Sequence, residues 1–160
     1  LGSVMLARPT ARATIVRWVT EWYETHIVFR YAGEDAPGEM PRYELGELPE
    51  GFVENLESQF VGTGMTAHFY ENEKGDVILF EYIYMQQGSL SGVNTENAYV
   101  ISVIVNDCEG LLVIPKEEDS NSMLMWLDPE QDLQFTLDAP LGQEDILHMA
   151  ESVHLVETMK

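Results

Sequence analysis

The sequence has few basic residues. Lysine and arginine together number 8 in 160 residues, against 28 acidic residues, so the formal net charge at pH 7 is −20. The imbalance is greatest from Tyr43 onward, where 23 acids face three lysines. Nucleic acids and anionic lipids bind proteins through cationic contacts. The composition therefore excludes nucleic acid as a partner, and it limits contact with a membrane to an anchor outside this sequence.

This acidity has two interpretations. The simpler one is a solvated acidic surface that keeps the protein soluble. The other is that the acids attract a basic partner or loosely bound cations. The sequence alone leaves both open.

Cysteine and long apolar runs are also scarce. Cys108 is the only cysteine, so no disulfide forms within the chain and the fold rests on its core. We expect Cys108 to be a small buried or half-buried apolar residue, because no local motif marks it as a nucleophile. No stretch approaches the roughly 18 apolar residues that span a bilayer. The chain starts at Leu1 rather than Met, from which we expect a piece of a longer protein that follows a membrane anchor.

Motifs for catalysis, metals and cofactors are missing as well. None of the four histidines has the spacing of metal ligands. They are His26, His68, His148 and His154. A calcium loop around Gly75 is excluded, because Tyr70 and Lys74 would occupy ligand positions. With 28 acids, pairs of carboxylates arise by chance and say little about hydrolysis. We therefore expect no catalytic residues, no metal site and no cofactor.

What the sequence does contain is a set of strand patterns around residues 77–85, Val-Ile-Leu-Phe-Glu-Tyr-Ile-Tyr-Met. This stretch is rich in β-branched and aromatic residues, and both of its alternating faces are apolar apart from Glu81. It predicts a strand in the middle of a sheet. A turn at Lys74-Gly75-Asp76 joins it to a strand over residues 65–71, and we expect residues 98–105 as its other neighbour.

Further extended segments are predicted along the chain. They cover residues 26–31, 43–48, 52–61, 65–71, 98–105, 111–115, 123–128 and 133–137. Segment 52–61 also has helical spacing, and the flanking glycines favour a strand. Residues 86–95 read as a loop.

Two helices are predicted at the ends of the chain. Residues 9–25 begin with a proline and carry an apolar stripe, and residues 143–154 carry Ile146, Met149, Ala150 and Val153 on one face. Short turns between strands imply antiparallel pairing. The predicted class is α+β, an antiparallel curled sheet of about six to eight strands with an N-terminal and a C-terminal helix packed on it. We expect a single domain over residues 1–160, with residues 1–8 as a flexible lead-in.

Candidate binding residues follow from the aromatic content of the predicted strands. Phe80, Tyr82 and Tyr84 alternate along the central strand, and Trp126 lies on another. An aromatic row that faces water would favour binding of a partner or an apolar ligand. A buried row would make the same residues part of the core.

Several short motifs together resemble a bacterial family, the domain of unknown function 4367. They are Leu48-Pro-Glu-Gly-Phe52 after Tyr43, Ile78-x-Phe80-x-Tyr82, Val93-Asn-Thr-Glu-Asn-Ala98, Gly110-Leu-Leu, Leu124-x-Trp126 and Asp145-Ile-Leu-His-Met-Ala-Glu-Ser152. The resemblance covers residues 43–153. It implies the extracytoplasmic part of a membrane-anchored protein, in some cases with an architecture like that of anti-sigma factors. It supplies no catalytic residue.

Three functions are therefore considered. The first is a non-catalytic extracytoplasmic interaction or sensing domain of a membrane-tethered bacterial protein, acting in cell-envelope signalling, with an unknown protein as its partner. The second is a carrier that holds a small apolar ligand in a curled-sheet cavity. The third is a hydrolase that uses two of the scattered acids.

Overall fold

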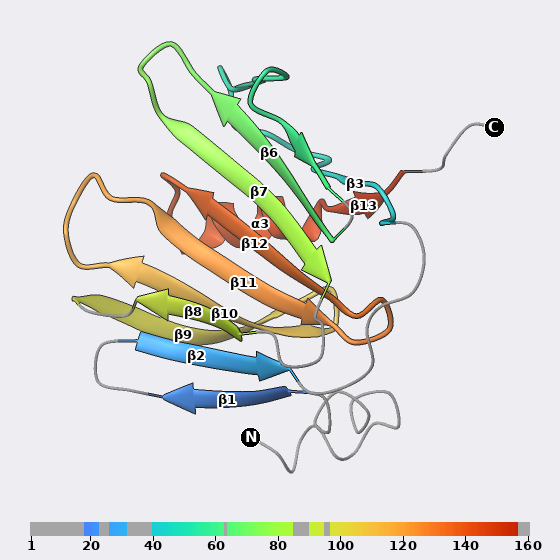
Figure 1. Ribbon diagram of the computed structural model, residues 1–160. Helices are drawn as coiled ribbons and strands as arrows, with labels where there is room; N and C mark the ends of the chain where they lie inside the picture. Colours follow the sequence, from blue (N-terminus) through green and yellow to red (C-terminus); the bar gives the residue numbers. More distant parts are fainter. Residues whose placement is uncertain are drawn as a thin grey trace.

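An antiparallel sheet of eight strands forms the body of the structure, a computed structural model (Figure 1). The structure describes residues 18–22, 26–31, 40–62, 64–84, 90–94 and 97–156. The strands of this sheet are β4 (Val53–Glu54), β5 (Phe60–Val61), β6 (Met65–Glu71), β7 (Val77–Tyr84), β9 (Ala98–Val105), β10 (Cys108–Pro115), β11 (Ser122–Asp128) and β12 (Leu133–Ala139). Their order is β4-β6-β7-β12-β11-β10-β9, and β5 also pairs with β6.

Strand β7 occupies the interior position that its sequence predicts. A tight hairpin joins β6 to β7, where the Asn72 side-chain oxygen accepts hydrogen bonds from the backbone N–H of Lys74 at 3.0 Å and of Asp76 at 2.9 Å. Gly75 adopts a positive φ of 86° there, which glycine permits without strain. The predicted turn and the predicted pairing of residues 65–71 with 77–85 are confirmed over the described residues.

The other neighbour of β7 was predicted wrongly. Strand β7 pairs with β12, with Phe80 opposite Leu137, whereas β9 lies at the far edge of the sheet. After β7 the chain forms β8 (Leu90–Asn94) in a separate sheet and returns to the main sheet only at that edge. Consecutive hairpins from β9 to β12 then fill the sheet inward until β12 lies beside β7.

The predicted N-terminal helix over residues 9–25 is wrong where the structure describes it. Residues 18–22 form strand β1 (Trp18–Trp22), which pairs with β2 (His26–Tyr31). Strand β2 pairs in turn with β8, so the predicted loop over 86–95 is wrong at residues 90–94. Aromatic and β-branched residues dominate β1 and suit a strand, and ladder hydrogen bonds to β2 outweigh their helical spacing. The rest of that helix, and the lead-in over residues 1–8, lie outside the described residues.

The remaining segments differ from their predictions only in extent. Residues 52–61 form the two short strands β4 and β5 rather than one strand, with the turn 55–58 between them. Residues 43–48 contribute only β3 (Tyr43–Glu44), which pairs with β13 (His154–Leu155). The C-terminal helix is α3 (Gln143–Glu151), which ends before the predicted residue 154 because the chain turns into β13.

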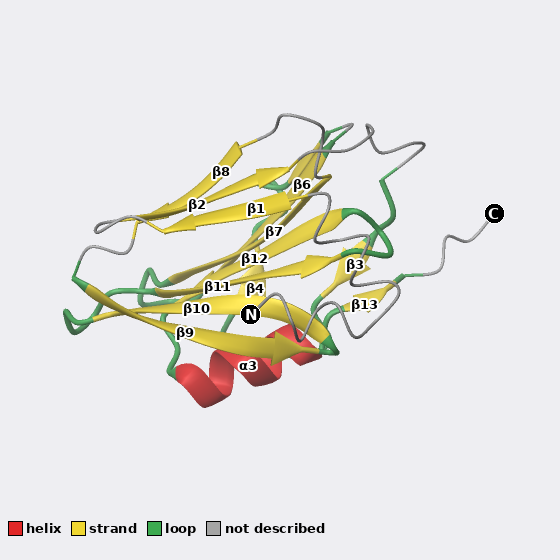
Figure 2. Cartoon of the chain, turned by 90° about the horizontal axis from the view of Figure 1, so that it is seen from below, coloured by secondary structure: helices red, strands yellow, loops and turns green. Residues whose placement is uncertain are grey.

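Three layers result (Figure 2). Helix α3 covers one face of the eight-stranded sheet, and the three-stranded sheet of β1, β2 and β8 lies on the opposite side. Ile146, Met149 and Ala150 of α3 are buried, as their spacing predicts. The sheet remains open, with β4 and β5 at one edge and β9 at the other. The described fold is thus mostly β, and α3 is its C-terminal helix.

Candidate functional site

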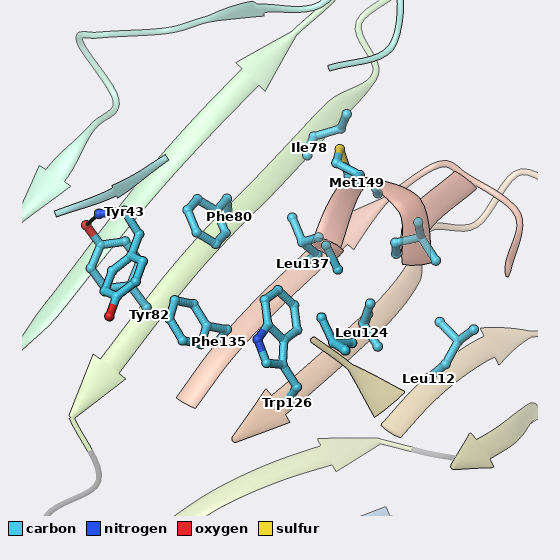
Figure 3. Packing of buried hydrophobic residues seen from close by; sticks show 14 of the residues in the cluster. Tyr43, Ile78, Phe80, Tyr82, Leu112, Leu124, Trp126, Phe135, Leu137 and Met149 are labelled. Carbon is cyan, nitrogen blue, oxygen red and sulfur yellow. Dashed lines mark hydrogen bonds between the residues drawn. The ribbon is translucent and has the colours of Figure 1, made fainter. Parts of the chain in front are cut away.

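The predicted binding residues lie mainly in the core. Phe80, Tyr82 and Trp126 are buried, and Tyr84 is partly buried. Phe80 and Tyr82 of β7, Phe135 of β12 and Trp126 of β11 form a row of rings on the face of the sheet that carries α3 (Figure 3). Phe135 links the row, with ring centroids 6.3 Å from Phe80 and 5.1 Å from Trp126. Such distances are typical of aromatic pairs in protein interiors. Tyr43 packs edge-on against Tyr82 and Phe135, with ring centroids 5.4 and 5.0 Å away, so the row is part of the core.

A buried histidine extends this row at the β6 end, and no motif in the sequence indicated it. The ring of His68 stacks on Phe80 with centroids 6.0 Å apart, and its Nδ1 lies 2.9 Å from a carboxylate oxygen of Glu54. The other ring nitrogen, Nε2, is buried and has no hydrogen-bond partner among the described residues. The pairing of β4 with β6 brings Glu54 and His68 together. The contact therefore depends on the strand register and has no motif in the sequence.

The lone thiol of Cys108 is half-buried near the turn between β9 and β10. Burial, followed by the charges of Asp128, Asp107 and Glu130, raises the pKa of Cys108 to about 11. The thiol therefore stays protonated at neutral pH, whereas a cysteine nucleophile reacts as the thiolate. This matches the predicted half-buried apolar role.

Two kinds of feature are absent from the described residues. No three or more histidine, cysteine, aspartate or glutamate side chains come together there as a metal site requires. No helix in the described part of the chain is both long and apolar enough to cross a bilayer.

Of the two edges of the eight-stranded sheet, the one formed by β9 is longer and better suited to pairing with another strand. Strand β9 pairs only with β10 in its sheet. The two strands meet in a two-residue turn at Asn106 and Asp107, which both have positive φ, and the backbone N–H of Lys116 donates to the carbonyl of Asn97 at 3.0 Å. In a hairpin of this kind, every second residue of each strand forms backbone hydrogen bonds to the other strand. The odd-numbered residues of β9 therefore face β10.

The even-numbered residues of β9 direct their backbone groups away from the sheet. They are Ala98, Val100, Ser102 and Ile104. Their N–H and C=O groups form a row of the kind with which another strand pairs. Ser102 is exposed and so is Ile104, with 59% of its surface accessible, so solvent reaches the side chains of this strand.

Strand β9 also lacks the usual features that protect a sheet edge. Proteins commonly blunt edges with short strands, charged side chains or proline. The eight residues of β9, Ala-Tyr-Val-Ile-Ser-Val-Ile-Val, contain neither a charge nor a proline. The opposite edge does contain such protection, because β4 and β5 have only two residues each and a turn separates them. The candidate functional site is therefore the outer edge of β9, called the β9 edge below.

Comparison with known proteins places the chain in a family. Residues 42–153 match the family described as "Domain of unknown function (DUF4367)". The match spans the eight-stranded sheet and α3 and leaves out β1 and β2. The chain therefore belongs to this family, as the motifs between Tyr43 and Ser152 predict. No curated protein and no solved structure matches the chain significantly.

Proposed function

We propose that this chain is a non-catalytic interaction domain that binds a protein partner by strand addition at the β9 edge. Strand addition uses main-chain hydrogen bonds for affinity and alternate side chains for specificity. The observation that carries the proposal is the uncharged row of outward backbone groups from Ala98 to Ile104. The family resemblance supports its setting, the extracytoplasmic part of a membrane-tethered bacterial protein that acts in envelope signalling.

An interaction domain is better supported than a carrier for an apolar ligand. A carrier needs a cavity lined by apolar and aromatic side chains. The aromatic residues first considered for such a lining contact one another instead, with Phe80 and Tyr82 at 5.5 Å between ring centroids. The β9 edge, in contrast, needs no cavity to bind.

Site-specific cross-linking tests the binding surface. In one variant of the complete protein, expressed in its own cells, a photo-reactive residue replaces Ile104 at the β9 edge. In a second variant it replaces Glu73 in the β6–β7 turn. We expect a discrete cross-linked partner from position 104 and not from position 73. Adding Ser102→Pro removes one outward N–H without touching the ladder to β10 and should abolish the product, whereas Ser102→Ala should preserve it. The same product from the Ser102→Pro protein would refute strand addition.

The proposed location has a separate test. Protease added to cells whose outer layers have been opened but whose cytoplasmic membrane is intact should digest this domain in the complete protein. A cytoplasmic marker enzyme should survive the same treatment. Protection of the domain until the cytoplasmic membrane is lysed would refute an extracytoplasmic setting.

A further inference from the structure

The geometry points to a partner segment that is extended, apolar in its centre and basic at both of its ends. This inference rests on the proposed function and names the chemistry that the β9 edge selects. It follows from the charges at the two ends of β9 and from the apolar strand between them.

The C-terminal end of β9 is strongly acidic. The turn that follows Val105 contains the exposed Asp107. Strand β11 runs antiparallel to β10 with Trp126 opposite Gly110, so Asp128 and the exposed Glu130 lie at the same end of the sheet as this turn. Like charges that meet in one place favour a cationic group opposite them.

The N-terminal end of β9 is acidic as well. Ala98 lies opposite Pro115, and β10 continues from there into Lys116 and the exposed acids Glu117, Glu118 and Asp119. The one cation of this stretch, Lys116, lies over the ring of Tyr99, with its Nζ 5.0 Å from the ring centroid. Within residues 115–119, three acids therefore outnumber one lysine at this end of β9.

Between its ends β9 offers apolar side chains on both sides of its backbone. Val100 and Ile104 flank Ser102 on one face, and Tyr99, of which 60% is exposed, lies on the other. A strand added alongside would place its own side chains next to these, and β-branched or aromatic residues gain most from such cross-strand pairs. The centre of the partner segment should therefore be apolar.

A second copy of this chain does not fit the same requirements. Pairing β9 with another β9 would satisfy the backbone groups. It would also bring the acidic ends of two strands together on chains that each carry a net charge of −20. Like charges placed opposite each other oppose association, so a basic partner is favoured over a dimer.

Designed peptides test this inference on the folded chain. The probe is the capped peptide Lys-Lys-Val-Thr-Val-Thr-Val-Thr-Lys-Lys, and the matched control replaces each lysine with glutamate. Backbone amide exchange is followed by NMR at Val100, Ser102 and Ile104, with the inward amides of Ile101 and Val103 as internal references. We expect the lysine probe to slow exchange at the outward amides only, with an affinity at least about tenfold above that of the glutamate peptide. The difference should shrink as salt is raised.

The outcomes separate this inference from the proposed function. Equal affinity for the two peptides, or no binding of either, would overturn the basic partner; cross-linking that depends on Ser102 would still support strand addition. A concentration-dependent dimer whose outward amides are protected would make the occupant a second copy and also overturn it. Binding of the lysine probe that survives Ser102→Pro would place the peptide elsewhere and overturn it too. Loss of binding in Ser102→Pro and retention in Ser102→Ala would support it.

Discussion

Replacing Phe80 with alanine tests whether the aromatic row belongs to the core. The Phe80 side chain is fully buried between His68, Tyr82 and Phe135, with ring centroids 5.5 to 6.3 Å away. Removal of a buried phenylalanine ring costs roughly 3–5 kcal/mol, because apolar burial is lost and a cavity remains. In a domain of this size, that loss lowers the midpoint of thermal unfolding by roughly 6–20 °C.

The assay is urea unfolding followed by tryptophan fluorescence, with thermal unfolding in parallel. Tyr99→Ala is the matched control, since it removes an exposed ring from a strand and should change the free energy of unfolding by at most about 0.5–1 kcal/mol. If Phe80→Ala leaves too little folded protein, Phe80→Leu retains most of the volume and should cost about 1–1.5 kcal/mol. A loss below about 1 kcal/mol for Phe80→Ala would refute the core assignment and return Phe80 to the candidate binding residues.

Three further predictions concern polar groups that are buried or half-buried. Tyr82→Phe should destabilise the fold by about 1–3 kcal/mol in urea unfolding, because the Tyr82 hydroxyl accepts a hydrogen bond from the buried backbone N–H of Tyr43 at 3.1 Å. Burial raises the pKa of Glu81 above its ordinary 4.5. The protonated side chain therefore contributes to the free energy of unfolding below pH 4.5, and this contribution is lost as pH rises through the raised pKa and Glu81 ionises. Glu81→Gln should therefore raise the free energy of unfolding at pH 7 by about 1 kcal/mol and not at pH 4. Cys108, with a pKa of about 11, should react with iodoacetamide at pH 8 roughly a hundredfold more slowly than the unfolded chain.

Each of these predictions has a contradicting result. Tyr99→Phe is the control for Tyr82→Phe, because it removes the hydroxyl of an exposed tyrosine, and equal effects of the two would assign no particular role to the bond with Tyr43. A Glu81→Gln gain that is the same at pH 4 and pH 7 would show that charge is not its cause. Labelling of Cys108 at the rate of the unfolded chain would mean that its thiol is accessible and ionises normally.

Local patterns predicted much of this fold because they depend on side chains near in sequence. Alternation in residues 77–84 and the turn at Gly75 identify the β6–β7 hairpin, and the spacing of Ile146, Met149 and Ala150 identifies α3. Each of these elements buries one face, and the residues of that face recur every two positions in a strand or about every 3.6 positions in a helix. The same reasoning predicted residues 18–22 wrongly, because their apolar residues suit both a helical stripe and a strand. Pairing with β2 determines that they form a strand.

The candidate site was beyond such reasoning, since it depends on strand order. The run from Ala98 to Val105 predicted a strand, and its position as the next predicted strand after the loop that follows residues 77–85 suggested a place beside β7. Only the pairing of β7 with β12 leaves β9 at an edge. The contact between Glu54 and His68 was hidden for a similar reason, because the register of β4 against β6 brings them together.

The seam between β7 and β12 also determines how the domain is assembled in time. Hairpins such as β9–β10 join residues as close as Val105 and Cys108, whereas the seam joins Tyr84 to Leu133, 49 positions apart. Closing the longer loop costs about 2–3 kcal/mol more chain entropy. The meander from β9 to β12 and the β6–β7 hairpin are therefore two locally encoded units, and we expect their docking along the seam to be slower than the formation of either hairpin unit. Until that step occurs, β12 and β7 are both additional unpaired edges, so the nascent chain exposes more strand-pairing surface than the finished domain does.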